Sequence, residues 1–468
     1  MTDVRLVGLD FGTTTSRCVA AKARLSQNVI SGRHEFSDVR EVFRSPIELT
    51  PFTPAGLDEV RLEQLLDEWL AAAARDEPIF GGGALVTGLA AQQPNSAALV
   101  ELVRSRVSDV LVATAGDPCL EAWLAFQANA GPLSRAQPDR WVINLDIGGG
   151  TTNVAVGKGG EVSRTGSLFV GARHVEFVPG TYCIVRLSDY ARSLLQELAI
   201  AARPGDSLSE QDVRRILDWQ IALIDAAITG DRAAFASPLG RMHEQVALDR
   251  LDEVREPIFY LSGGVGELVY DILQGRPLPT TTAFGDLGID LAQWIAASPE
   301  WATRLGEGRQ HAGRATVYGL LLYATQVSGS TFFLPDPALL PARDVPILGR
   351  VTSNSTAEQI RDILQLVARS ATGGCVVVSL GSGDASTVRL LGERIASAIR
   401  TSNIPRSTLL VLIVRENVGK ALGGYVSQWG AIPVRLIVLD EIEPLDARFV
   451  RIGSLRDGVV PVSFYGMN

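Results

Sequence analysis

Cysteine, histidine and lysine are all scarce in this 468-residue chain, and each shortage excludes a kind of site. The cysteines, at Cys18, Cys119, Cys183 and Cys375, lie far apart, and none forms a C-x-x-C pair. This argues against zinc and iron–sulfur centres built on such pairs, and it favours a reducing cytoplasm. The four histidines are equally scattered and are interpreted as structural or exposed residues.

Charge and hydropathy exclude further classes of protein. Only Lys22, Lys158 and Lys420 are lysines among 43 basic residues, a bias that we interpret as codon usage and not as an arginine-based binding surface. The net charge of −9 argues against nucleic acid or an anionic membrane surface as a partner. The sequence has no long apolar run and reaches its first strand by Val4 without a hydrophobic leader, so we expect a cytoplasmic protein that is neither exported nor membrane-spanning.

The chain does contain two copies of one short pattern, LDFGTTTS at Leu9–Ser16 and LDIGGGTT at Leu145–Thr152. Each copy follows an apolar strand-like run, reaches an aspartate, and turns through glycines and hydroxyl residues. Glycine lets backbone amides approach a polyphosphate without a Cβ in the way, and successive N–H groups form a nest for anions. One copy alone could be an ordinary β-hairpin turn, whereas two copies predict phosphates held from two sides. The predicted phosphate ligands are Gly12, Thr13, Thr14, Thr15, Ser16, Gly148, Gly149, Gly150, Thr151 and Thr152.

A metal site and a nucleoside site are predicted next to these turns. Asp10 and Asp146 end their strands and would repel phosphate alone, but they would attract a hydrated Mg²⁺ that bridges the two. A third glycine-rich turn, LSGGVGE, follows the apolar run PIFYL. In isolation it is a loop of unknown purpose. After two phosphate turns, it is predicted to pass against adenine and ribose. The residues concerned are Gly263, Gly264, Val265, Gly266 and Glu267.

This order of motifs resembles the actin, Hsp70 and sugar-kinase superfamily of ATPases. The resemblance implies two lobes of α/β fold, each a ribonuclease H-like mixed sheet flanked by helices, joined by two connecting helices. Residues Asp117–Gly131 and Arg314–Ala324 resemble those helices, although ordinary buried helices would have the same small residues. Asp10, Asp146 and Asp117 are the catalytic candidates. Asp117 would position the attacking water, unless it only caps its helix.

The pattern of the C-terminal part predicts a separate α/β unit. Three short apolar strands alternate with helices after about residue 373, which predicts a small parallel sheet. We therefore predict lobes at residues 1–135 and 136–333 and a C-terminal α/β segment at 334–468. The loop Gly381–Ser386 could bind an anion at a helix N-terminus, but it lacks the third glycine of a dinucleotide fingerprint. Lys420 lacks P-loop spacing and is rejected as a phosphate lysine.

The remaining motifs resemble the EutA family, the reactivating factors of adenosylcobalamin-dependent ethanolamine ammonia-lyase. The phosphate and adenosine motifs and VATAG at Val112–Gly116 recur across the superfamily. The more particular matches are RATVYG with SGST at Ser328–Thr331, ENVGKALG at Glu416–Gly423, and the closing DARFVRIGSL with VVPVS. The resemblance implies a slow, Mg²⁺-dependent ATPase that pulls the inactivated lyase open, so that damaged cobalamin is exchanged for intact adenosylcobalamin. This sequence departs from the family at Thr87, Gly88 and Leu89, where Thr-Gly-Glu is usual.

Two other functions stay open at this stage. A sugar or polyol kinase would use the same nucleotide apparatus, but it needs a base beside an acceptor hydroxyl, and no second aspartate lies in a convincing acceptor motif. A filament-forming scaffold ranks last, because the chain lacks a terminal amphipathic anchor. The sequence leaves open association with a bacterial microcompartment and whether the target lyase uses ethanolamine or a diol. The C-terminal α/β segment, which simpler relatives lack, is a hypothesis for the part that contacts the lyase.

Overall fold

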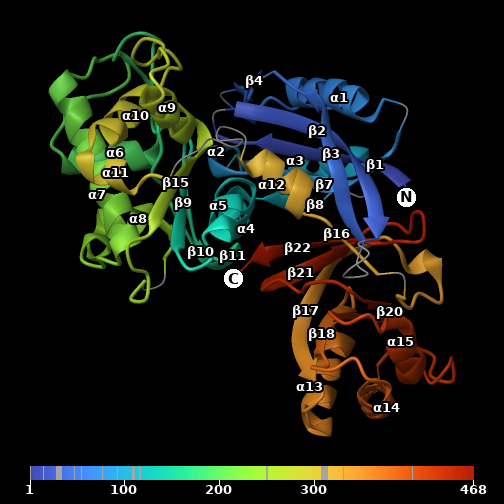
Figure 1. Ribbon diagram of the computed structural model, residues 1–468. Helices are drawn as coiled ribbons and strands as arrows, with labels where there is room; N and C mark the ends of the chain where they lie inside the picture. Colours follow the sequence, from blue (N-terminus) through green and yellow to red (C-terminus); the bar gives the residue numbers. More distant parts are fainter. Residues whose placement is uncertain are drawn as a thin grey trace.

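A computed structural model describes residues 2–467 except 14, 28–33, 47, 54, 76, 92, 108–110, 115–116, 249–250, 307–314, 330 and 403. Three sheets organise the chain (Figure 1). The N-terminal lobe, in blue, and the second lobe, in green and yellow, lie on either side of the helices α4 and α12. The C-terminal unit, in orange and red, lies against the N-terminal lobe.

The N-terminal lobe has the strand order β3-β2-β1-β7-β8, with β4 beside β2. Strands β1, β2 and β3 form an antiparallel meander, and β7 and β8 run parallel to β1. The strands are β1 (Thr2–Phe11), β2 (Thr15–Gln27), β3 (His34–Arg44), β4 (Glu48–Leu49), β7 (Ile79–Val86) and β8 (Leu111–Thr114), with a small ladder of β5 (Phe52–Thr53) and β6 (Gly56–Leu57). Its helices are α1 (Glu59–Ala74), α2 (Gly88–Ala91) and α3 (Ser96–Arg106).

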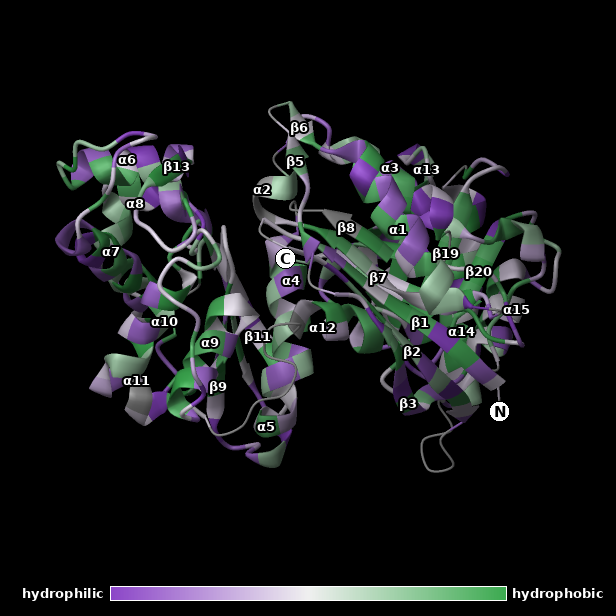
Figure 2. Cartoon of the chain, turned by 90° about the horizontal axis from the view of Figure 1, so that it is seen from above, coloured by the Kyte–Doolittle hydropathy of each residue, from purple (hydrophilic) through white to green (hydrophobic). Residues whose placement is uncertain are grey.

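Helix α1 shows how sequence pattern becomes packing in this lobe. The Asp58 carboxylate accepts the N–H of Arg61 and caps the helix. Leu62, Leu66 and Trp69 recur at helical spacing and are buried against the sheet. Figure 2 shows the result as alternating hydrophilic and hydrophobic residues along α1 and α3 beside the hydrophobic strand β7.

The second lobe repeats the same topology. Its order is β14-β11-β10-β9-β15, with β9, β10 and β11 antiparallel and β15 parallel to β9. The strands are β9 (Trp141–Ile147), β10 (Thr152–Lys158), β11 (Glu161–Leu168), β14 (Glu244–Val246) and β15 (Ile258–Ser262), with a second ladder of β12 (Val175–Phe177) and β13 (Ile184–Leu187). The helices are α6 (Asp189–Glu197), α7 (Glu210–Thr229), the 3₁₀ turn η2 (Ala234–Ala236), α8 (Pro238–His243), α9 (Gly263–Leu273), α10 (Gly288–Ala297) and α11 (Pro299–Arg304). Two lobes of one topology, each opening with a meander, confirm the predicted two-lobed actin-like fold.

Two connecting helices cross between the lobes. The first comprises α4 (Pro118–Ala125), the π-helical turn η1 (Phe126–Ala130) and α5 (Gly131–Ala136), and the second is α12 (Ala315–Tyr323). A Cβ at Gly319 of α12 would lie 2.5 Å from the carbonyl oxygen of Leu124 in α4. Only glycine permits this approach, so the small residues predicted for these helices are required where the helices cross.

The C-terminal unit is a larger sheet than predicted. Strands β18, β19 and β20 form the expected parallel sheet with α14 and α15, and β17 with α13 adds a fourth parallel strand that was not predicted. Strands β21, β22 and β16 extend the sheet to seven strands in the order β16-β22-β21-β17-β18-β19-β20. Strands β21 and β22 come from the closing motifs, which had not been assigned to strands. The elements are β16 (Gln326–Val327), η4 (Pro337–Leu339), β17 (Ala342–Thr352), α13 (Ala357–Arg369), β18 (Gly374–Ser379), α14 (Ala385–Thr401), β19 (Leu409–Val414), α15 (Gly419–Ser427), β20 (Arg435–Leu439), β21 (Ala447–Ile452) and β22 (Pro461–Met467).

Candidate functional site

The two repeated turns have the same backbone geometry. In the β1–β2 turn the N–H of Gly12 donates to the carbonyl oxygen of Thr15 at 3.0 Å. In the β9–β10 turn the N–H of Gly148 donates to the carbonyl oxygen of Thr151 at 2.9 Å. Each donor lies two residues after the strand's aspartate, so the sequence repeat is also a structural repeat.

The tips of the two turns meet. A Cβ at Gly150 would lie 2.6 Å from Thr13 Oγ1, so glycine is needed for this contact between the lobes. The second tip is held from behind, because the N–H of Arg173 donates to the Gly149 carbonyl at 2.6 Å and His174 Nε2 lies 2.9 Å from the Gly150 carbonyl oxygen. A carbonyl only accepts, so His174 Nε2 carries the proton. Burial lowers the pKa of His174 to about 4, which keeps the imidazole neutral.

Asp146 lies close enough to Asp10 to influence its ionisation. Burial, assisted by the negative charge of Asp146, raises the pKa of Asp10 to about 6. Burial also raises the pKa of Asp146, although the hydroxyls of Ser262 and Thr316 donate to its oxygens at 2.9 and 3.4 Å. Asp10 Oδ1 is buried and has no hydrogen-bond partner. An orphaned carboxylate oxygen facing a second carboxylate is suited to accept from the water shell of a cation.

A third carboxylate, Glu121 of α4, reaches the same place and was missed by sequence reasoning. Burial, and then the charges of Asp146 and Asp10, raise its pKa well above the usual range. Its carboxylate is hydrogen-bonded to Asn153 of β10 and to Thr87, directly after β7, so it connects elements of both lobes. The signal was available, because Glu121 is the sole charged residue in the apolar run from 118 to 134.

Arg17 on β2 was also missed. It pairs across the strands with Asp10, and its positive charge lowers the pKa of both Asp10 and Asp146, opposing their burial. Its Nε donates to Thr15 Oγ1 at 3.1 Å, which holds the guanidinium beside the first turn. A cation at this position complements phosphate as well as carboxylate.

Several of the predicted hydroxyl donors face the protein interior. Ser16 is fully buried, with its Oγ 3.0 Å from Thr50 Oγ1, and Thr152 Oγ1 donates to the Val170 carbonyl at 2.8 Å. These two side chains stabilise the turns. The N–H groups of Gly12 and Gly148, also predicted to bind phosphate, are used in hydrogen bonds within the turns. Thr14, also predicted, lies outside the described residues.

The predicted adenosine turn is the N-terminus of α9. Gly263 has φ of +78°, and a Cβ there would lie 2.5 Å from a carbonyl oxygen of β9, so the turn is pressed against the second phosphate turn. Gly264 borders open space. Val265 and Gly266 are buried in the lobe, and Glu267 is half-buried. Gly264 is therefore the most exposed residue of the predicted set, and Gly263 and Glu267 are partly exposed.

Asp117 has different partners from the other candidates. Its Oδ1 accepts from the N–H groups of Leu120 and Met467, both at 3.0 Å, and its Oδ2 accepts from the N–H of Gly466. The carboxylate therefore caps α4, which was the alternative to a catalytic role for Asp117, and it also binds the end of β22. The carboxylates that the structure brings together are Asp10, Asp146 and Glu121.

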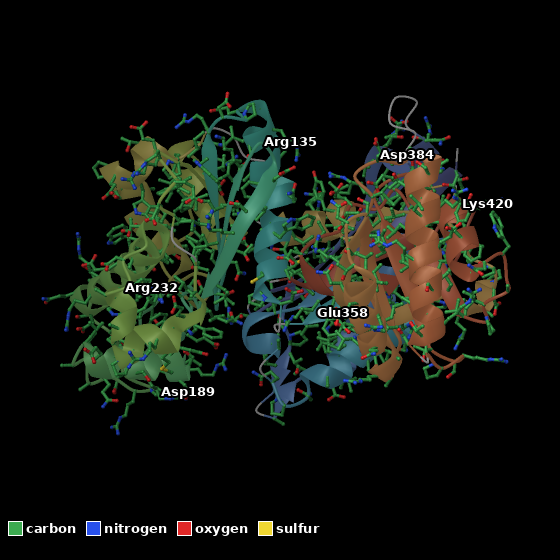
Figure 3. All side chains as sticks on the ribbon, turned by 90° about the horizontal axis from the view of Figure 1, so that it is seen from below. Arg135, Asp189, Arg232, Glu358, Asp384 and Lys420 are labelled. Atoms are coloured by element: carbon green, nitrogen blue, oxygen red, sulfur yellow. The ribbon has the colours of Figure 1, made fainter. Side chains whose placement is uncertain are left out.

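The glycine-rich loop of the C-terminal unit caps a helix. Asp384, labelled in Figure 3, accepts from the N–H groups of Ser386 and Thr387, both at 3.0 Å. The hydroxyls of Ser386 and Thr387 also donate to this carboxylate, and these hydrogen bonds, with that of the Thr387 N–H, hold the pKa of Asp384 well below its usual range. A permanent carboxylate thus takes the helix N-terminus that an anion would need. Lys420 is exposed on the same unit (Figure 3).

Within the described ranges, no three His, Cys, Asp or Glu side chains are grouped so that they could bind a metal ion directly. No helix of the described part combines the length and apolar composition needed to cross a bilayer.

Comparison with known structures adds little here. A Ppx/GppA family protein of Aquifex aeolicus covers 69% of this chain and 89% of its own, with 18% identity and a TM-score of 0.35. The ethanolamine utilisation protein EutJ of Carboxydothermus hydrogenoformans covers 62% and 90%, with 16% identity and a TM-score of 0.26.

Comparison of sequences is more informative. The chain is 30% identical over 467 residues to the ethanolamine ammonia-lyase reactivase EutA of Salmonella typhimurium, covering 98% of this chain and 97% of the relative. The protein of the same name from Escherichia coli is 29% identical over 471 residues, with the same coverage. The family described as ethanolamine utilisation protein EutA matches residues 2–466. The chain belongs to the EutA family.

Proposed function

We propose that this protein is an ATP-dependent reactivating factor for adenosylcobalamin-dependent ethanolamine ammonia-lyase. In this role it opens the inactivated lyase so that damaged cobalamin leaves and intact adenosylcobalamin enters. The observation that carries the proposal is the pair of matching phosphate turns around Asp10 and Asp146, in a chain whose relatives over 98% of its length are named as reactivases of that lyase.

Asp10 and Asp146 would hold Mg²⁺ through its water shell. Three features support this assignment: the orphaned Asp10 Oδ1, the raised pKa values of both carboxylates, and the lack of a direct three-ligand cluster in the described residues. The ion would supply positive charge between phosphate and carboxylate, which would otherwise repel.

The backbone of the two turns would cradle the β- and γ-phosphates, with Arg17 as a side-chain donor. Thr13 and Gly149–Thr151 remain the candidate contacts, because Ser16 and Thr152 are turned inward. Gly263 and Gly264 at the start of α9 would face the nucleoside. The N-terminus of α9 adds a favourable dipole next to the phosphates.

Glu121 is the group best placed to activate the attacking water. Because its pKa is raised, Glu121 is a stronger base in its ionised form than an exposed carboxylate, and it lies beside both aspartates. We assign this role to Glu121 and not to Asp117, whose oxygens bind three backbone N–H groups.

Nucleotide binding would favour the closed arrangement of the lobes, because the turns contribute from both sides. ATP supplies a γ-phosphate that touches both turns, and its hydrolysis removes that link. The open and closed populations then shift according to their difference in affinity for the nucleotide.

We further propose that the segment 334–468 contacts the lyase, and that the lobe boundaries lie near residues 135 and 333. Association with a microcompartment remains a separate proposal.

The test is recovery of turnover-inactivated ethanolamine ammonia-lyase with this protein, Mg·ATP and fresh adenosylcobalamin. Asp10→Asn is the site variant, and Asp189→Asn, on the exposed first turn of α6, is the matched control. Recovery that requires ATP and is lost only in Asp10→Asn would support the proposal. No recovery despite ATP binding would refute it, and phosphate transfer to a sugar or polyol would favour a kinase.

A further inference from the structure

The two connecting helices pack on different lobes. Helix α4 lies on the second-lobe strands β9, β10 and β11, and α12 lies on the N-terminal strands β1, β2 and β7. They touch where Gly319 of α12 meets Leu124 of α4. A change in the angle between the lobes must therefore move α4 relative to β7.

The N-terminal side of β22 is linked to β7 through two residues outside the strand, Thr325 and Arg456. Thr325, which follows α12, has its Oγ1 3.0 Å from the N–H of Gly82 in β7 and 3.4 Å from Ser463 Oγ in β22. Arg456, just before β22, donates to the carbonyl oxygen of Ile79 in β7 at 2.8 Å. We call these contacts the β7 anchor.

The far end of the same strand is hydrogen-bonded to the start of α4, in the first connecting helix. Asp117, at the N-terminus of α4, accepts from the N–H groups of Gly466 and Met467. The Asp117 side chain is buried, and Tyr465 and Met467 pack against the apolar cluster of Leu120 and Leu124. We call these contacts the α4 anchor. Figures 1 and 2 both place the C-terminal end of the chain beside α4.

The seven residues of β22 thus bridge two bodies that move against each other. A strand held in a sheet by β21 and β16 cannot stretch, because its backbone is already extended. Lobe closure must break an anchor or turn the C-terminal sheet. Asp117 lies one helical turn before Glu121, so the helix that carries the proposed base also carries the α4 anchor.

We propose that β22 is a mechanical strap that converts closure of the nucleotide cleft into rotation of the C-terminal unit, with Asp117 as the positioning residue. The proposal rests on the proposed function, because that rotation is what would act on the bound lyase. Asp117 then matters for coupling and not for hydrolysis.

The primary experiment measures hydrogen exchange of the Gly466 and Met467 amides with ADP and with a non-hydrolysable ATP analogue. In the wild-type chain we expect their protection to differ between the two nucleotides. In Asp117→Asn, where the side chain has one accepting oxygen in place of two, we expect faster exchange that is the same with both nucleotides. Unchanged exchange in the variant, or no nucleotide effect in the wild type, would overturn the strap. This readout does not depend on the lyase.

Activity supplies the second readout. Asp117→Asn should hydrolyse ATP like the wild type but lose about tenfold in lyase recovered per ATP, the size of a typical coupling between sites. Thr325→Val, which cuts the β7 anchor and leaves α4 intact, should do the same and covers the case in which the Asp117 variant folds poorly. The double variant should be no worse than either single one, because one broken anchor already frees the strap. Wild-type recovery per ATP in both variants would refute the strap, whereas no recovery by the wild-type chain would refute the proposed function alone.

Discussion

Replacing Glu121 with glutamine is expected to stop ATP hydrolysis while leaving ATP bound. Glutamine has the same length and can still hydrogen-bond to Asn153 and Thr87, so the substitution removes a charge and a proton acceptor with little change in packing. The substitution therefore tests the role of Glu121 as a base separately from its role in packing.

The magnitude follows from the surroundings of the carboxylate. A positioned general base contributes about 10²- to 10⁴-fold in rate, or about 3 to 5 kcal/mol of activation free energy. The substitution should raise the activation barrier but lower the free energy of the ATP-bound state before hydrolysis. Burial and the charges of Asp146 and Asp10 disfavour an ionised Glu121, so neutral glutamine relieves repulsion. ATP, itself an anion, should bind Glu121→Gln at least as tightly as the wild-type chain.

Phosphate release under single-turnover conditions, together with titration of a fluorescent ATP analogue, measures the two effects separately. Glu101→Gln on the exposed face of α3 is the matched control and should leave both quantities unchanged. A Glu121→Gln protein that hydrolyses ATP at the wild-type rate would refute the assignment of the base. One that has lost ATP binding would show instead that Glu121 shapes the binding site.

Three further perturbations test the site. Asp10→Asn should abolish the Mg²⁺ dependence of ATP affinity in calorimetric titrations, and a persistent dependence would place the ion elsewhere. Gly150→Ala should weaken ATP binding by about tenfold or more, because its Cβ would lie 2.6 Å from Thr13 Oγ1 and force the turn tips apart; an unchanged affinity would mean that the tips are not in contact in the bound state. His174→Gln should reduce acid sensitivity. The folded pKa of about 4 lies below the unfolded value of 6.5, so unfolding takes up a proton and stability is lost as pH falls from 6.5 to 4, by up to about 3 kcal/mol. Denaturant unfolding at these two pH values should show a smaller loss for the variant, and an equal loss would contradict the buried neutral histidine.

Local pattern was enough to predict much of the fold. The α1 helix follows from apolar spacing and an Asp cap, and α7 begins with a capping box of Ser209 and Asp212. The phosphate turns follow from an aspartate, glycines and hydroxyls within eight residues. In each case the interacting groups are close together in the sequence, so a short stretch of sequence is enough to predict the structure.

Contacts between distant segments could not be predicted in this way. Asp117 and Met467 are 350 residues apart, and nothing near either one indicates the other. Strands β21 and β22 pair with each other, but they join the sheet through β17 and β16, which lie far earlier in the sequence, and strand pairing depends on tertiary context. The burial of Val265 and Gly266 was not visible in the sequence, because a glycine-rich turn and the start of a buried helix look alike. Glu121 was the exception, since a lone charge in an apolar helix is a local signal.

The π-helical turn η1 has a consequence for the first connecting helix. A π turn holds one residue more than an α turn, so every side chain beyond it is rotated by about 100° relative to an uninterrupted helix. Before η1, Glu121 is in phase with the two aspartates. Within and beyond it, Gln127 Nε2 donates to the Gly160 carbonyl at 3.0 Å, and Ser134 Oγ accepts the Gly160 N–H at 2.9 Å. A regular helix could be in phase with the carboxylates or with the β10–β11 turn, but not with both, and deleting one residue from 126–130 would force that choice.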